Sequence, residues 1–309
     1  MPVKNSRVPL VATLAAVVGA LTLLVVMNPL QRNGADLGQP SESGARFVEA
    51  EVGASDRPKA SATPSSASST PPAGALPGAT RTDALPPVVD HGPRRGNKVA
   101  LTFDADMTDA MRRQLRSGAV RSYANLEIID RLEREGVPAT FFLTGMWVEQ
   151  YPDVTRRLAA NPQFELANHT YGHLAFTADC YGLPRIDRRK MTADVARTFD
   201  LVSAYGGRQT RYFRFPGLCH DRTALTALAP LGLTVVDGDV VSGDPFATAW
   251  QPIVRAVLDR VRPGSVIVLH VTEANAPMTD EALPHILAGL AERGLEPAPL
   301  SEVLDAPPA

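Results

Sequence analysis

The regular alternation of strand-like and helix-like segments across residues 97–304 constrains the fold of this chain more than any other feature. Each strand-like segment is a short β-prone run, and a helix-like segment places its apolar residues on one face, as Leu126, Ile129 and Leu132 do. The expected strands are 98–103, 139–144, 164–167, 212–214, 234–236 and 265–270. The expected helices are 123–136, 152–160, 191–204, 223–231, 252–261 and 280–292. This alternation predicts an α/β domain with a mostly parallel sheet, either open or closed into a barrel.

Residues with useful chemistry follow four of the expected strands. They are Asp104 and Asp106, His169 and His173, Arg214, and His270. Because the carboxyl ends of parallel strands lie at one edge of the sheet, that edge is the expected place for a functional site.

Taken one at a time, these residues leave their roles open. His169 and His173 are four positions apart, so on a helical turn they would share a face and could bind one metal ion. Asp104 could equally cap the next element, Arg214 could lie at the surface, and His270 could be a structural histidine.

Taken together and in order, the residues resemble the motifs of the NodB-homology polysaccharide deacetylases, carbohydrate esterase family 4. Thr102-Phe103-Asp104-Ala105 corresponds to the first motif, T-F-D-D, and His169-Thr170-Tyr171-Gly172-His173 matches the H-[ST]-x-x-H motif. Arg214-Phe215-Pro216 matches the third motif, and Val268-Leu269-His270 represents the last. Asp237-Gly238-Asp239 looks like the aspartate-rich fourth motif, with Asp244 nearby. The resemblance covers about residues 97–304.

The resemblance implies a distorted (β/α) barrel with fewer than eight regular repeats and a divalent metal, usually zinc. It implies that His169 and His173 bind this metal together with an aspartate, and that Asp104 is the general base. Arg214 would hold that base in place through charge-assisted hydrogen bonds.

The remaining implied roles concern the leaving group and the oxyanion. His270 would be the general acid, paired with Asp239 or, less well placed, Asp237. The backbone N–H of Gly217 would stabilise the oxyanion.

The chain departs from the family pattern at three places. The second aspartate of the first motif, a metal ligand in the family, is replaced by Ala105, so we expect Asp106 to serve instead. The alternatives are that Asp104 itself contacts the metal or that a water fills the position. The fourth motif lacks its usual tryptophan, and Gly217 stands where an aromatic residue is expected after Pro216, which leaves the substrate groove more open or rebuilt.

The two cysteines, Cys180 and Cys219, follow the histidine and arginine motifs, which puts both on loops near the expected site. In an exported chain the favoured interpretation is a disulfide that joins these loops. The alternatives are two free buried thiols or an additional metal ligand.

Residues 8–27 are an uncharged apolar stretch preceded by Lys4 and Arg7. As a helix it is long enough to span a bilayer, and the positive charges favour a cytoplasmic tail at residues 1–7 with the rest of the chain outside. We therefore expect a single-pass membrane anchor in a bacterial cell membrane with an extracytoplasmic catalytic domain. The alternative is a cleaved signal peptide and a secreted protein.

Residues 28–96 have a different composition, with 10 Pro, 8 Ser and 8 Gly and with Phe47 as the only Phe, Tyr or Trp. Such a segment buries too little apolar surface to offset its chain entropy, so we expect a disordered tether between the anchor and the folded domain at 97–304. Residues 305–309 are expected to be a short tail.

The expected function is metal-dependent removal of acetyl groups from an N-acetylated glycan, with peptidoglycan as the favoured polymer because a tether suits a wall-facing substrate. Chitooligosaccharide and O-acetylated polysaccharide are the alternative substrates within the same class. The alternative is a catalytically inactive glycan-binding domain on the same fold, a possibility raised by Ala105. The formal net charge of −2 argues against nucleic-acid binding, and nothing in the sequence implies an obligate protein partner.

Overall fold

The computed structural model describes residues 84–305. These residues all belong to one compact unit. The tail expected at 1–7, the membrane span at 8–27 and the greater part of the tether therefore lie outside the described residues. Between residues 84 and 305, every helix is too short or too polar to cross a bilayer.

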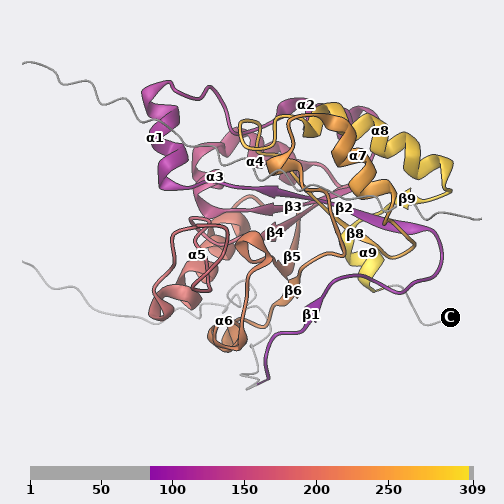
Figure 1. Ribbon diagram of the computed structural model, residues 1–309. Coiled ribbons are helices and arrows are strands. Elements are labelled where there is room, and N and C mark those ends of the chain that lie inside the picture. The colour runs from indigo at the N-terminus through magenta and orange to yellow at the C-terminus, as the bar shows by residue number, and fades with distance from the viewer. Residues whose placement is uncertain (1–83, 306–309) are drawn as a thin grey trace, which may run out of the picture. The chain divides into compact units, whose positions relative to one another are not determined.

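The centre of the fold is a parallel sheet with the strand order β1-β6-β5-β4-β3-β2-β8-β7, and the short β9 also pairs with β2 (Figure 1). Its strands are β1 (Val88–Val89), β2 (Lys98–Ala105), β3 (Ala139–Leu143), β4 (Phe164–Asn168), β5 (Arg208–Phe213), β6 (Thr234–Val236), β7 (Val240–Val241), β8 (Val266–His270) and β9 (Glu296–Pro297). The parallel α/β arrangement expected from the sequence is confirmed. The two end strands, β1 and β7, do not pair with each other, so the barrel expected from the resemblance is open.

Helices connect most of the strands. They are α1 (Asp109–Ser117), α2 (Leu126–Arg134), α3 (Gly145–Gln150), α4 (Pro152–Ala160), α5 (Met191–Ser203), α6 (Arg222–Leu228), α7 (Trp250–Leu258), α8 (Thr279–Glu292) and α9 (Leu300–Leu304). All six expected helices are present, while α1, α3 and α9 were not expected. Helix α1 buries only Met111, and α3 has only six residues, so neither presents an apolar face that is clear in the sequence.

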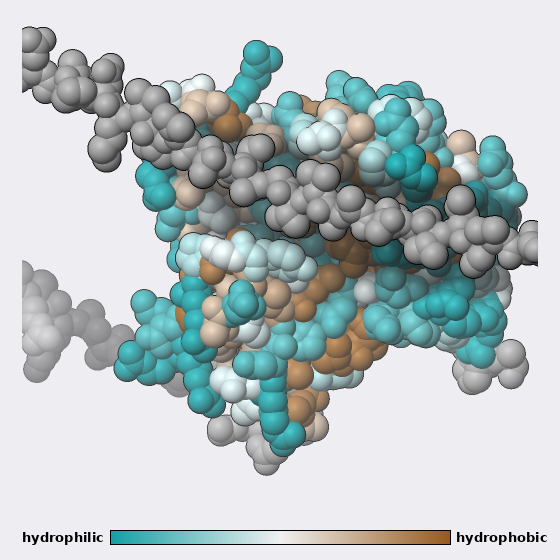
Figure 2. Space-filling model, in the orientation of Figure 1, coloured by the Kyte–Doolittle hydropathy of each residue, from teal (hydrophilic) through white to brown (hydrophobic). Residues whose placement is uncertain are grey.

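Helix α2 illustrates how local sequence sets these elements. The Asn125 side chain accepts a hydrogen bond from the backbone N–H of Ile128 and so caps the amino end. Ile128, Ile129 and Leu132 are buried, which packs one face of the helix on the sheet. The outward faces of such helices are polar, and Figure 2 shows a largely hydrophilic surface with hydrophobic side chains gathered near the middle of the visible face.

The two faces of β2 pack against different hydrophobic clusters. Val99, Leu101, Phe103 and Ala105 belong to the main hydrophobic core, which includes residues of α2, α7 and α8. Ala100 belongs to a second cluster, inside the curl of the sheet, with residues of β3, β4, β6 and β8. Because side chains alternate along a strand, Thr102 and Asp104 face the same interior as Ala100.

Helix α9 closes this interior at the amino ends of the strands. Leu300 and Val303 are buried in the inner cluster, next to residues of β2, β3 and β4. The carboxylate of Glu165, which is 2% exposed, accepts hydrogen bonds from Thr140 and from Ser301 at the start of α9. The carboxyl ends of the strands are thus the open end of the curl.

The folded domain begins earlier than expected. Val88 and Val89 pair with Val235 and Val236 of β6, and His91 forms a bridge to Ser265 at the start of β8. The segment therefore crosses from one side of the curled sheet to the other, which corrects the expected tether end at residue 96. Its short apolar pair and flanking prolines gave no periodic signal in the sequence.

Arg94 fixes this segment to the domain. Its guanidinium donates to the Asp239 carboxylate at 2.6 Å and to Ser265 Oγ at 3.0 Å. Asp239 also accepts from Ser265 Oγ and from the backbone N–H of Val266, and its side chain is only 13% exposed. Asp239 therefore ties the β6–β7 connection and the start of β8 to the segment that precedes β2.

We expect Arg94→Ala to lower the free energy of unfolding by about 1–2 kcal/mol, because it removes a charge-assisted partner from a mostly buried carboxylate. Urea unfolding measures this change. The matched control is Lys98→Ala, which breaks the exposed Lys98–Glu302 pair and should cost less than about 0.5 kcal/mol. Equal losses in the two variants would contradict a structural role for Arg94.

Candidate active site

The register of the sheet brings the expected site residues to one level. Asp104 of β2 pairs across the sheet with His270 of β8 on one side and with Phe142 of β3 on the other. Asn168 of β4 pairs with Phe213 of β5, so the next residues, His169 and Arg214, leave the sheet side by side. The four expected strand ends therefore converge at the open end of the curl.

Arg214 and Asp104 form a buried ion pair inside the curl. Arg214 Nη1 lies 2.7 Å from Asp104 Oδ1, and the two side chains are 0% and 5% exposed. The guanidinium also donates through Nε to the carbonyl of Val236 and lies 4.0 Å over the Phe142 ring. This confirms the expected contact between Arg214 and Asp104, and it leaves the other carboxylate oxygen, Oδ2, 3.8 Å from His169 Nε2.

Asp106, His169 and His173 form a cluster whose potential ligand atoms all lie within 4.8 Å of one another. Nε2 of His169 and Nε2 of His173 lie 3.4 and 3.3 Å from Asp106 Oδ1. This oxygen is buried and has no hydrogen-bond partner, which is the environment of an atom that binds a cation.

The protonation of the cluster suits a metal. His169 Nδ1 lies 2.8 Å from the carbonyl of Arg214, which can only accept, so this nitrogen carries the proton and Nε2 is free in the neutral ring. Burial lowers the pKa of His173 to about 4, so this ring is neutral at neutral pH. Burial alone would raise the pKa of Asp106, but His173, His169 and His270 hold it well below its usual range. Two imidazoles and one carboxylate are a typical donor set for zinc.

The alternation of side chains along β2 explains why Ala105 does not leave the cluster without a carboxylate. Asp104 and Asp106 both line the site cavity, whereas Ala105 is fully buried in the hydrophobic core. This is the result of strand alternation, which puts residues i and i+2 on one face. Of the alternatives for the carboxylate, Asp106 is the one that lies in the cluster with both histidines.

His169 and His173 lie on a tight loop, and the helical turn considered for them is wrong. Thr170 and His173 have positive φ angles of 69° and 54°. The loop is held by its own polar residues, because Asn168 Oδ1 accepts from Thr170 N and Thr170 Oγ1 accepts from His173 N. This folding of the loop brings the imidazoles to a centroid distance of 5.0 Å.

The same loop is fixed from outside by α3 and α5. Gly145 N donates to the carbonyl of Thr170, and Asp194 Oδ1 accepts from Tyr171 N at 2.8 Å. The Tyr171 hydroxyl donates to Glu149, and the Arg197 guanidinium stacks 3.5 Å over the Tyr171 ring. The position of the histidines thus depends on residues far along the chain.

His270 pairs with Asp244, so the expected partner Asp239 is wrong. His270 Nδ1 lies 2.8 Å from Asp244 Oδ1, and His270 N donates to Asp244 Oδ2 at 2.7 Å. Asp244 is fully buried and also accepts from Thr279 Oγ1. Burial alone would lower the pKa of His270, but Asp244, Asp106 and Asp104 raise it to about 10.

The other two aspartates of the expected fourth motif have different partners. Asp239 binds Arg94, as described above, and Asp237 Oδ2 lies 2.9 Å from His220 Nε2. Asp244 lies five residues beyond Asp239, and no local pattern in the sequence distinguishes it from Asp237 and Asp239 as the partner of His270.

A cavity of about 270 Å³ lies at the open end of the curl. Arg214 and Asp244 are buried and contact two residues that line it, Asp104 and His270. Asp104, Asp106, His169, His173 and His270 line it. Gly217, expected to supply a backbone N–H, also lines it.

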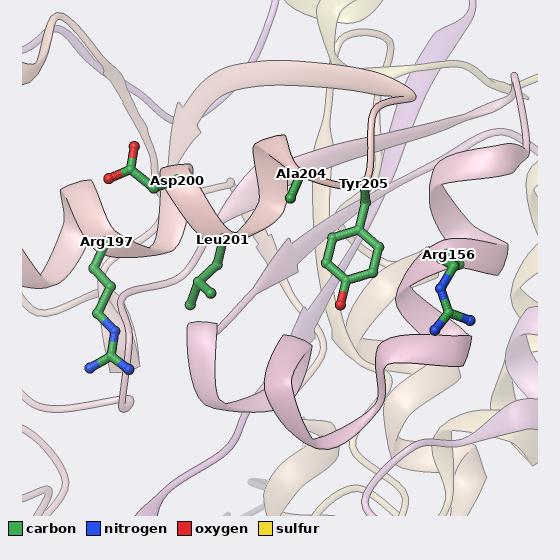
Figure 3. A pocket seen from close by; sticks show the side chains of 6 residues that line it. All are labelled: Arg156, Arg197, Asp200, Leu201, Ala204 and Tyr205. Atoms are coloured by element: carbon green, nitrogen blue, oxygen red, sulfur yellow. The ribbon is translucent and has the colours of Figure 1, made fainter. Parts of the chain in front are cut away.

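A larger hollow of about 590 Å³ lies elsewhere, between α4 and α5 (Figure 3). Its lining residues are Arg156, Arg197, Asp200, Leu201, Ala204 and Tyr205. The two arginines are already paired, Arg197 with Glu149 and Arg156 with Asp153. The chemistry-bearing residues line the smaller cavity, so we take that cavity as the site.

The expected disulfide between Cys180 and Cys219 is present, with a Cα–Cα distance of 6.0 Å. It joins the loop after β4 to the loop after β5. Both alternatives, free thiols and metal ligation, are therefore excluded for this structure.

Comparison with known proteins decides the family. A sequence profile described as polysaccharide deacetylase matches residues 91–236. The chitooligosaccharide deacetylase of Sinorhizobium fredii is 33% identical over 178 residues, which cover 54% of this chain and 80% of that protein. This chain belongs to the polysaccharide deacetylase family.

Other members support the assignment. The peptidoglycan-N-acetylglucosamine deacetylase of Bacillus cereus is 26% identical to this deacetylase over 200 residues, covering 63% of this chain and 65% of that protein. The crystal structure of a peptidoglycan N-acetylglucosamine deacetylase superposes with a TM-score of 0.59 at 23% identity, covering 71% of this chain and 94% of that one, which shows a shared fold. The named relatives are hydrolases of amide bonds, so this polysaccharide deacetylase is an enzyme of that class.

We expect the Asp106→Ala variant to lose bound divalent metal and Asp104→Asn to retain it, because only Asp106 lies in the cluster with both histidines. Elemental analysis of the purified proteins gives the metal content. Metal loss from Asp104→Asn with full retention by Asp106→Ala would show that Asp104 is the ligand.

The half-buried Asp194 gives a second expectation, on stability. Burial raises its pKa to about 6, above the ordinary value of 3.8, so its contribution to stability is present below pH 3.8 and is lost as the pH rises through 6. Asp194→Asn keeps an oxygen for Tyr171 N without the buried charge, and should raise the free energy of unfolding at pH 7 by about 1–2 kcal/mol.

Urea unfolding across this pH range tests the expectation, with the exposed Asp200→Asn on the same helix as control. The Asp194→Asn advantage should shrink as the pH falls toward 4. An advantage of the same size at every pH would contradict the role of the charge.

Proposed function

We propose that this deacetylase removes acetyl groups from an N-acetylated cell-wall glycan, with peptidoglycan as the favoured polymer. The observation that carries the proposal is the convergence of the Asp106–His169–His173 cluster, Asp104 and His270 on one cavity. A bound divalent cation, with zinc favoured by the donor set, would polarise the acetyl carbonyl and lower the pKa of a water molecule.

In the proposed reaction Asp104 is the general base. Arg214 holds one of its oxygens at 2.7 Å and leaves the other directed toward the cluster, where it can accept a proton from the attacking water. The positive charge of Arg214 compensates the carboxylate charge in this buried position, where an unpaired charge would be costly.

His270 is the proposed general acid. Asp244 binds Nδ1, which leaves Nε2 on the cavity side, 3.8 Å from Asp106 Oδ2. From there it can donate a proton to the amine nitrogen as the bond to the carbonyl carbon breaks, which is required because an unprotonated amine is a very poor leaving group. The N–H of Gly217 is proposed to donate to the oxyanion.

The alternative, a catalytically inactive glycan-binding domain, was favoured by Ala105. That argument loses its weight because Asp106 supplies a carboxylate to the cluster. O-acetylated polysaccharide stays a possible substrate within the same reaction class, since it also presents an acetyl carbonyl.

Export is part of the proposal. The Cys180–Cys219 disulfide supports an extracytoplasmic domain, because disulfides persist in oxidising compartments. We propose that residues 8–27 anchor the chain in a bacterial cell membrane as a single pass, with secretion after signal cleavage as the alternative.

Acetate release from purified peptidoglycan and from chitooligosaccharides tests the reaction. We expect activity that a chelator abolishes and added zinc restores. Acetate release that is unaffected by complete metal removal would overturn the proposed mechanism, and glycan binding without any acetate release would favour the inactive alternative.

We expect His270→Ala to lower kcat by about 100-fold or more while keeping the metal, because it removes the proposed proton donor but no member of the cluster. Asp244→Asn should also lower kcat, since it removes the charge that holds Nδ1. The control is His285→Ala, a histidine stacked on Trp250 away from the cavity, which should leave kcat unchanged. Unchanged kinetics in His270→Ala would exclude it as the general acid.

A further inference from the structure

Two large aromatic side chains, Tyr181 and Phe246, are exposed at the mouth of the site cavity. They are 74% and 77% exposed, and both line the cavity. Their ring centroids lie 6.1 Å apart, so the two rings form one continuous apolar surface, which we call the aromatic lip. Exposed apolar surface next to a polar cavity is typical of a ligand contact.

The position of Tyr181 is fixed by its neighbours. The preceding residue, Cys180, is buried and bonded to Cys219. A Cβ atom on Gly217 would lie 2.7 Å from Cys180 Sγ and 2.9 Å from Cδ2 of the Tyr181 ring. The Tyr181 ring therefore packs directly on the Gly217 backbone and occupies the space of a side chain at that position.

This contact accounts for a departure noted in the sequence. Gly217 stands where an aromatic residue was expected, and here a loop 36 residues earlier supplies the ring instead. Any residue larger than glycine at 217 would displace Tyr181 or the disulfide. The absence of a side chain at Gly217 is therefore what allows the Tyr181 ring to lie there.

Phe246 comes from the opposite side of the cavity mouth. It ends the short 3-10 helix Asp244–Phe246, whose first residue binds His270. The lip therefore spans from the loop after β4 to the loop after β7, and one end of it is rigidly linked to the proposed general acid.

The cavity is small compared with a polymeric substrate. At about 270 Å³ it lies below the roughly 300–1,000 Å³ of typical ligand pockets, so it has room for one sugar residue. The neighbouring sugars of a glycan must lie outside the cavity. The C–H groups on the faces of a pyranose ring are apolar, and they pack well on flat aromatic surfaces.

We propose that Tyr181 and Phe246 bind the sugar residue adjacent to the one that is deacetylated, so that binding of a glycan extends beyond the cavity. This inference rests on the proposed function, which places the reacting sugar in the cavity. The two rings act in binding and take no part in the bond-breaking steps.

The test compares Tyr181→Ala and Phe246→Ala with the wild-type full chain, using a tetramer of N-acetylglucosamine as probe. We expect KM for the tetramer, and its Kd by calorimetry, to rise about tenfold in each variant, which corresponds to about 1.4 kcal/mol. Hydrolysis of 4-nitrophenyl acetate, which carries no sugar, is measured on the same preparations, and kcat/KM for the tetramer should fall about tenfold more than kcat/KM for this ester. Tyr181→Phe keeps the ring and should behave as wild type.

Tyr205→Ala is the control for the loss of an aromatic ring. Tyr205 lies between α5 and β5, at the amino ends of the strands, and it does not line the site cavity. Tetramer KM and Kd values within twofold of wild type in both lip variants would overturn the inference. If the wild-type chain binds the tetramer but releases no acetate, the proposed function fails, and the Kd values alone then decide for or against the lip.

Discussion

The buried pair of Arg214 and Asp104 is the interaction on which the site depends. One guanidinium inside the curl joins Asp104 of β2, the carbonyl of Val236 in β6 and the ring of Phe142 in β3. Asp104 matches the charge of this buried guanidinium and Val236 accepts from its Nε, whereas Nη2 has no hydrogen-bond partner among the described residues. The pair therefore fixes the relative positions of these strands at the level where the chemistry takes place, and it balances a carboxylate charge in an apolar interior.

The parallel register of the sheet places the other site residues at the same level as this pair. Asp104 and His270 are direct neighbours across β2 and β8, and His169 and Arg214 follow a pair of neighbours in β4 and β5. Asp104, His169 and His270 reach the cavity because their strands end there, and Arg214 contacts Asp104 from inside the curl. The residues that lie off the strands, His173 and Asp244, are held by hydrogen bonds to Thr170 and Thr279.

Much of the site could be predicted because its residues follow strands, and strand ends are readable from apolar runs. The prediction of Asp106 in place of Ala105 agrees with its position in the cluster. The assignment of Asp239 failed because several aspartates lie close together in the sequence, and only the path of the chain decides which one reaches His270. Asp239 points instead to Arg94, in a segment that the sequence had assigned to a tether.

The sequence alone determined the alternating α/β pattern, the order of the motifs and the family that they resemble, because these depend on local periodicity and residue type. The tertiary structure decided what depends on distant contacts: the open sheet, the early start of the domain, the loop conformation of the histidines and the pairing of His270 with Asp244. It also decided that Tyr181 covers Gly217. These features join residues tens to hundreds of positions apart, and no local pattern records which of several similar side chains will meet once the sheet curls.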